Sequence, residues 1–157
     1  MGLLSASLVV PRPLPEVFAF FAEAANLQRI TPPWLDFRIV TAPPIEMRPG
    51  AVIDYRLRIR GIPIGWRSEI TVWDPPHLFV DEQRRGPYRR WVHTHRFRPV
   101  DGGTLVEDEV QFGAPGGRLI ERLFVDRDVQ MIFRHRQQAT LDAFGVTAVG
   151  PVRVELS

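Results

Sequence analysis

Hydrophobic and polar side chains alternate along most of this 157-residue chain. A period of two is typical of β-strands that bury one face and leave the other in water. The alternation predicts seven strands, at residues 3–10, 37–41, 51–60, 64–74, 78–84, 89–99 and 104–112. The breaks between successive strands from residue 37 onward are rich in Pro and Gly, so neighbouring strands should pair antiparallel.

Three segments have the periodicity of helices instead. An apolar stripe with i, i+3, i+4, i+7 spacing begins at Leu14 and ends at Phe21, behind a Pro-rich start. A second short helix is expected at residues 24–30. A long helix is expected at residues 118–144, where Gly145 ends it.

The order of these elements predicts an α+β fold of the helix-grip kind. One long helix cannot cover both faces of a seven-stranded twisted sheet, so the economical arrangement is a curved antiparallel sheet wrapped around that helix. Such a sheet leaves a cavity between itself and the helix. We expect residues 1–145 to form a single domain and residues 146–157 to form a tail of uncertain order.

The alternation also predicts which side chains face the cavity. In strand 64–74 the inward face includes Trp66, Ser68, Ile70 and Val72, which leaves Trp73 outside as a candidate contact surface. The apolar cavity wall is expected to contain Tyr55, Trp66, Phe79, Trp91, Phe97, Phe112, Ile132 and Phe133.

Polar side chains recur on the inner faces of the last three strands and of the long helix. They are Asp81, Gln83, His93, His95, Asp108 and Arg136. Buried ionisable groups are costly unless they are paired. Arg136 should therefore pair with Asp81 or Asp108, or with a carboxylate or phosphate of a ligand.

Two stretches carry a resemblance to a known family. They are FVDEQRRGPYRRWVHTHRFRPVDGGTLVEDEV at Phe79–Val110 and IFRHR at Ile132–Arg136. The chain resembles an uncharacterised bacterial branch of the START/SRPBCC superfamily, which includes Bet v 1-like proteins and polyketide cyclase/dehydrase-like domains. The resemblance implies the helix-grip fold and a hydrophobic ligand such as a lipid, polyketide or quinone. It also implies a sugar-epimerase-like partner domain, because members of this branch occur beside or fused to one.

Composition narrows the classes of function. The chain has no Cys, which excludes disulfides, thiolate nucleophiles and cysteine metal sites. The net charge of +2 indicates no nucleic-acid partner, and the Arg residues on the outer strand faces are interleaved with Glu. No apolar run approaches the roughly 18 residues of a membrane span. The N-terminus lacks the basic start of a signal peptide, so we expect a cytoplasmic protein.

Three interpretations of the polar cluster remain open. It can be a hydrogen-bonded network that orients a ligand or only holds the helix on the sheet. It can be an acid–base site, in which His93 or His95 is the base, Asp81 or Asp108 orients it, and Arg136 stabilises an oxyanion. It can also be a metal site, because alternate histidines on a strand share a face, but the His-x-His pattern is unspecific and we expect neither metal nor cofactor.

The sequence therefore predicts a protein that binds a hydrophobic or amphipathic small molecule in an internal cavity. Transport of that molecule is one form that this function can take. The named aromatic and aliphatic residues would form the walls, and the polar cluster would orient the ligand's polar end. The alternatives are a cyclase, dehydratase or isomerase that uses the same residues, and an interaction module such as a quinone or lipid chaperone.

Overall fold

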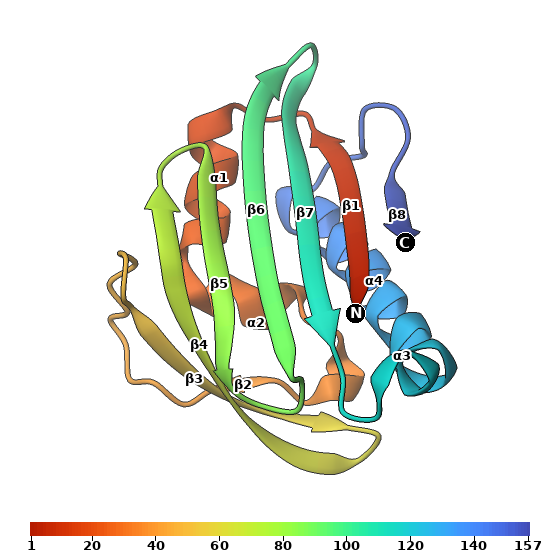
Figure 1. The fold of residues 1–157 in the computed structure, drawn as a ribbon. Coiled ribbons are helices and arrows are strands. Elements are labelled where there is room, and N and C mark those ends of the chain that lie inside the picture. Colours follow the sequence, from red (N-terminus) through yellow and green to blue (C-terminus); the bar gives the residue numbers. More distant parts are fainter.

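The computed structural model describes all residues, 1–157, and shows one curved antiparallel sheet with every helix on its inner side (Figure 1). The sheet has eight strands in the order β2-β3-β4-β5-β6-β7-β1-β8. The strands are β1 (Gly2–Val10), β2 (Arg38–Ile39), β3 (Val52–Ile59), β4 (Ile62–Asp74), β5 (Leu78–Arg85), β6 (Arg90–Val100), β7 (Gly103–Gly113) and β8 (Arg153–Leu156).

The helices lie in two groups along this inner side. The first group is α1 (Leu14–Ala22), α2 (Ala24–Ile30) and the 3-10 turn η1 (Pro33–Leu35); the second is α3 (Gly117–Ile120), the π turn η2 (Glu121–Val125) and α4 (Asp126–Phe144). Gly145 ends α4 in the left-handed conformation, as its position in the sequence predicts. The helix-grip α+β fold is confirmed.

Burial alternates along the strands as expected. In β7 every second residue from Thr104 to Phe112 is buried, and β1 pairs with it residue by residue from Gly2 to Val10. The inner faces then pack against the helices in two main clusters. One joins Val17 and Phe18 of α1 to the middle strands, and the other joins α4 to β1 and β7.

The expected faces are wrong at the end of β4. Its pairing with β5 shifts register between Ile70 and Val72, which is the irregularity of a β-bulge. Val72 is therefore exposed, whereas Trp73 turns inward and packs on Phe18 and Phe79, with ring centroids 5.4 and 5.5 Å apart. An extra residue in one strand reverses the alternation, so Trp73 belongs to the core and not to a contact surface.

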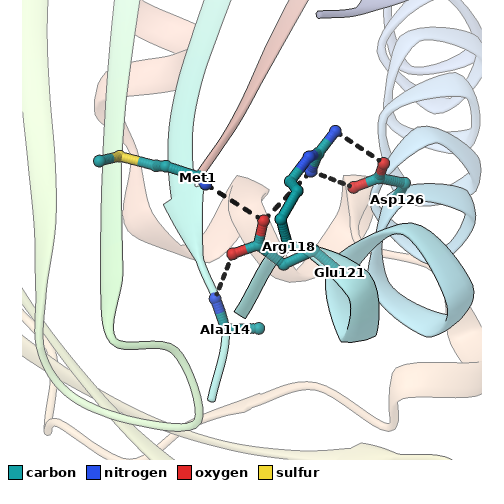
Figure 2. A network of polar contacts seen from close by, with 5 residues as sticks. All are labelled: Met1, Ala114, Arg118, Glu121 and Asp126. Atoms are coloured by element: carbon teal, nitrogen blue, oxygen red, sulfur yellow. Dashed lines mark hydrogen bonds and ion pairs between the residues drawn. The ribbon is translucent and has the colours of Figure 1, made fainter. Parts of the chain in front are cut away.

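The long helix is also interrupted, at the π turn. The buried carboxylate of Glu121 lies in this turn and accepts hydrogen bonds from the Ala114 N–H at 3.0 Å and from Arg118 at 3.1 Å (Figure 2). The N-terminal ammonium of Met1 lies 3.3 Å from Glu121, and Arg118 also pairs with Asp126 at 3.1 Å. Residues 118–144 are helical as expected, but apolar periodicity carries no signal for the extra residue of a π turn, so the sequence does not predict this irregularity.

The expected tail of uncertain order contains the eighth strand. β8 pairs antiparallel with β1, with Leu4 opposite Leu156 and Ser7 opposite Arg153. Val154 and Leu156 pack against the cluster beneath α4. The strand is short and lies far from its partner in sequence, which is why local alternation did not reveal it.

Candidate functional site

A cavity of about 830 Å³ lies between the inner face of the sheet and the helices. Its walls come from α1, α2, η1, the middle strands β3 to β6, the segment after β7, and α4. Of the 38 residues that line it, 25 are hydrophobic, so the interior suits an apolar molecule.

Most of the aromatic and aliphatic residues expected on the wall do line this cavity. They are Tyr55, Trp66, Phe79, Trp91, Ile132 and Phe133. Phe97 and Phe112 do not. Phe97 packs under α1 with its ring 5.3 Å from those of Phe18 and Phe21, and Phe112 lies in the solid cluster beneath α4. Alternation identifies the inner face of a strand, but it does not separate the hollow part of that face from the packed part.

An aromatic group forms one end of the cavity wall. The ring of Trp66 lies 5.6 Å from that of Tyr88 and 5.3 Å from that of Trp91, and Tyr88 and Trp91 are 4.8 Å apart. The sequence analysis missed Tyr88, because it lies in the turn between β5 and β6 where alternation stops. It also missed Phe37, whose ring lies 4.9 Å from that of Tyr55 beside the very short β2.

Gln83 has a different role from the expected one. Its side-chain amide donates to the carbonyl of Tyr88 at 2.7 Å, and its carbonyl accepts from the N–H of Tyr88 at 3.1 Å. Gln83 therefore fixes the β5–β6 turn and is not part of the cavity wall. The two bonds position Tyr88, so Gln83 acts on the site through its neighbour.

Four polar residues on adjacent strands form what we call the His–Asp cluster: Asp81 on β5, His93 and His95 on β6, and Asp108 on β7. Strand register places Asp81 opposite His93 and Asp108 opposite His95. The short hydrogen bonds run diagonally, because the Nε2–H of His93 donates to Asp108 at 2.7 Å and that of His95 donates to Asp81 at 2.7 Å. The two imidazoles stack 3.6 Å apart, and His95 also stacks on Phe79 at 3.9 Å.

Burial and hydrogen bonding set the charges of this cluster. Burial disfavours the ionised carboxyls, but the hydrogen bonds from the imidazoles and the charge of Arg136 outweigh it, so the pKa of Asp81 and the pKa of Asp108 lie below their ordinary value. Burial, together with the charge of His93, lowers the pKa of His95 to about 4. His95 is therefore neutral near pH 7, and its Nδ1 is buried without a hydrogen-bond partner.

The cluster faces the cavity only in part. Asp81, His93 and His95 line the cavity, whereas Asp108 lies behind the histidines. Asp81, His93 and His95 also offer three metal-ligand atoms within 4.8 Å of one another. Stacked rings in planes only 25° apart direct their nitrogen lone pairs side by side, so a shared ion would require the rings to leave the stack and break the 2.7 Å bonds. The arrangement suits proton and hydrogen-bond chemistry better than metal binding.

Arg136 lines the cavity from α4 but does not form the expected ion pair. Neither Asp81 nor Asp108 pairs with it, because each carboxylate is already bound by an imidazole. The guanidinium lies instead between two rings, with its carbon 5.6 Å from the centre of Phe21 and 5.9 Å from that of Phe133. Its Nε is buried without a hydrogen-bond partner.

A sheet that grips a C-terminal helix around an apolar cavity defines the class of helix-grip proteins. The chain belongs to the polyketide cyclase/dehydrase and lipid transport family, whose sequence model matches residues 1–146. None of the functionally curated proteins matches the chain.

Solved structures share the fold at low sequence identity. A protein of Chromobacterium violaceum is 12% identical with a TM-score of 0.69, covering 90% of this chain and 96% of its own. Ara h 8.0201 is 16% identical with a TM-score of 0.66, covering 90% and 95%. A protein described as a nucleoside-diphosphate sugar epimerase of Corynebacterium glutamicum is 20% identical with a TM-score of 0.67, covering 90% of this chain but 29% of its own. None of the helices in the present structure is long and apolar enough to cross a membrane.

Proposed function

We propose that this protein binds a hydrophobic or amphipathic small molecule in the cavity between α4 and the sheet, without converting it. The observation that carries the proposal is the cavity itself. Its volume of about 830 Å³ lies within the range of small-molecule sites, and its walls are mostly apolar. The family description, which includes lipid transport, supports the same class of ligand.

The polar side of the cavity gives the ligand an orientation. Asp81, His93, His95 and Arg136 line it on one part of the wall, whereas the aromatic group of Trp66, Tyr88 and Trp91 occupies another. An amphipath would place its polar end at the first and its apolar body against the second. Because the cluster satisfies most of its own hydrogen bonds, it can hold a polar group without taking part in a reaction.

Native mass spectrometry of the purified full-length chain, followed by organic extraction, tests the proposal. We expect a bound mass that the extract identifies as an amphipath, and saturable binding of the neutral dye Nile red. Ile132→Trp should fill the cavity and weaken dye binding at least tenfold, because Ile132 lines the wall. Val152→Trp is the matched control, because Val152 is exposed outside the cavity. Absence of both a bound mass and saturable dye binding would contradict the proposal.

An enzyme of the cyclase, dehydratase or isomerase type is the second candidate. The specific observation in its favour is that two imidazoles at the cavity wall are each oriented by a carboxylate, which is the arrangement of a general base. Incubation of the extracted molecule with the protein in D₂O separates the two candidates. Deuterium incorporation that disappears in His95→Gln would support catalysis, and recovery of the molecule unchanged supports binding alone.

The cellular setting that fits this function is the cytoplasm, with a small molecule and not a nucleic acid as the main partner. We further propose an epimerase-like partner domain, which the likeness to part of a longer chain described as a sugar epimerase supports. Co-purification with a separately encoded epimerase-like protein would test this association.

A further inference from the structure

Arg136 is a buried cation whose hydrogen-bond donors have no acceptor. The residue is 8% exposed, lies on the inner face of α4 and lines the cavity. Its Nε is fully enclosed and unpartnered. A guanidinium stays protonated at any ordinary pH and carries five N–H donors, so burying one without an acceptor is costly. Such a group calls for a partner that the chain itself does not supply.

The surroundings of Arg136 explain why the chain does not supply one. The rings of Phe21 and Phe133 offer favourable cation–π contacts, but they accept no in-plane hydrogen bonds from the guanidinium. Asp81 and Asp108 are held by the imidazoles at 2.7 Å.

The remaining charged side chains on the cavity wall also provide no hydrogen-bond acceptor for Arg136. Arg60 and Asp128 pair with each other at 3.0 Å near the surface. The two tyrosines on the wall carry no negative charge that could balance the guanidinium, because burial raises the pKa of Tyr88 to about 12 and raises the pKa of Tyr55 further. A molecule inside the cavity is therefore well placed to supply the acceptor that Arg136 lacks.

We propose that the ligand is an acid, an amphipath whose carboxylate binds the guanidinium of Arg136 while its apolar body packs against the aromatic wall. This inference rests on the proposed function and names the chemical class of its ligand. A carboxylate matches a guanidinium in shape and charge, because two parallel N–H groups meet two oxygens and one charge meets one charge. A phosphate monoester would leave a second negative charge uncompensated in an apolar cavity.

Paired ligands that differ only in the head group test the inference on the full-length chain. The pairs are dodecanoic acid with 1-dodecanol and 2-naphthylacetic acid with 2-(2-naphthyl)ethanol, each measured by displacement of Nile red. In at least one pair we expect the acid to bind about 10-fold or more tightly than the alcohol, as a charge-assisted pair requires. This comparison uses the unmodified protein, so it does not depend on the folding of any variant.

Variants locate the preference at Arg136. Arg136→Gln should bring the acid-to-alcohol ratio close to one by weakening the acid alone. Unchanged binding of the alcohol would show that the cavity is intact. Arg134→Gln is the matched control, because Arg134 is on the same helix and exposed, and it should keep the preference.

Two outcomes would overturn the inference. Equal binding of acid and alcohol in both pairs would contradict it and leave the proposed cavity function standing. Equal weakening of acid and alcohol by Arg136→Gln would make Arg136 a packing residue. Failure of Nile red and all four compounds to bind would instead contradict the proposed function as well.

Discussion

Two buried polar atoms have no hydrogen-bond partner in this protein, and both belong to residues that line the cavity, one on α4 and one on β6. One is the Nε of Arg136, which needs an acceptor, and the other is the Nδ1 of His95, which needs a donor. Native proteins rarely leave such atoms unpaired unless function requires it. At the scale of single residues, the cavity wall therefore contains one hydrogen-bond donor and one hydrogen-bond acceptor that no group of the protein satisfies.

Replacing Arg136 by Met should destabilise the ligand-free protein. The change keeps a side chain of similar length between Phe21 and Phe133, but it removes the cation whose charge lowers the pKa of Asp81 and the pKa of Asp108. We expect the free energy of unfolding at pH 7 to fall by about 1–3 kcal/mol, because two buried carboxylates lose a compensating charge. Urea denaturation measures it, with the exposed Arg134→Met as the control. A gain in stability would show that burying the guanidinium costs more than its attraction to the two carboxylates returns.

His95 should make the protein sensitive to acid above the range in which carboxylates titrate. Its pKa falls from 6.5 to about 4 on folding, so the unfolded chain binds the extra proton first and stability decreases as the pH drops from 6.5 toward 4. The lowered pKa values of Asp81 and Asp108 act later, because their stabilising effect is present above about 3.8 and is lost below it.

Urea denaturation at pH 7 and pH 4.5 measures the effect of His95. We expect a loss on the order of 2 kcal/mol in the native sequence, which is the linkage value for a shift of this size reduced for coupling within the cluster. His95→Gln should flatten this dependence because glutamine does not titrate. His77→Gln, at an exposed position, should leave it unchanged, and identical slopes in all three proteins would contradict the assignment.

At the scale of secondary-structure elements, irregularities decide where the site lies. The bulge in β4 turns Trp73 into the core, and the bonds from Gln83 hold the β5–β6 turn so that Tyr88 reaches the cavity. The π turn places the buried Glu121 against the end of β7 through Ala114. The bulge, the Gln83 hydrogen bonds and the π turn each change the position of one side chain, and none of them changes the order of the elements.

Glu121→Gln should loosen the connection between β7 and α4. The change removes the charge that Arg118 and the N-terminal ammonium satisfy, and we expect it to lower the free energy of unfolding by about 1–3 kcal/mol. Hydrogen exchange should accelerate in residues 114–126. Glu155→Gln, on the edge strand β8, is the control, and faster exchange throughout the chain in place of this segment would contradict the local role.

At the scale of the whole molecule, two segments far apart in sequence meet at the cavity wall. The turn before β4 touches the π turn, because Arg60 donates to the carbonyl of Phe124 at 3.2 Å and pairs with Asp128 at 3.0 Å. Exposed apolar side chains occur in the elements next to this contact, β4, α3 and the π turn. They are Ile62, Leu119, Leu123 and Phe124.

Arg60→Ala should speed exchange of the ligand. Loss of the two bonds frees the β3–β4 turn from the helix, while the cavity walls behind it are unchanged. We expect Nile red to dissociate several-fold faster in stopped-flow measurements, with a smaller change in equilibrium affinity. Arg56→Ala, an exposed change on the preceding strand β3, is the control. Equal dissociation rates in the two variants would show that the Arg60 contact does not control the exchange of the ligand.

Much of the fold follows from local pattern. Period-two alternation located seven of the eight strands, and the helical stripe and terminal glycine located α1 and α4, because burial on one face imposes its period on neighbouring residues. The same alternation placed Asp81, His93 and His95 on the cavity wall. It failed at the bulge, the π turn and β8, where long-range pairing and hydrogen bonding override local periodicity.

By itself, the sequence determined the order of the elements, the inward face of the strands up to the bulge in β4, and the kinds of side chain that face the helix. Only the tertiary structure decided that Phe97 and Phe112 fill solid core, that Gln83 holds a turn, and that the imidazoles take both carboxylates and leave Arg136 unpaired. The physical reason is that a side chain's face depends on its neighbours in the chain, whereas its partner depends on distances between strands and helices far apart in sequence.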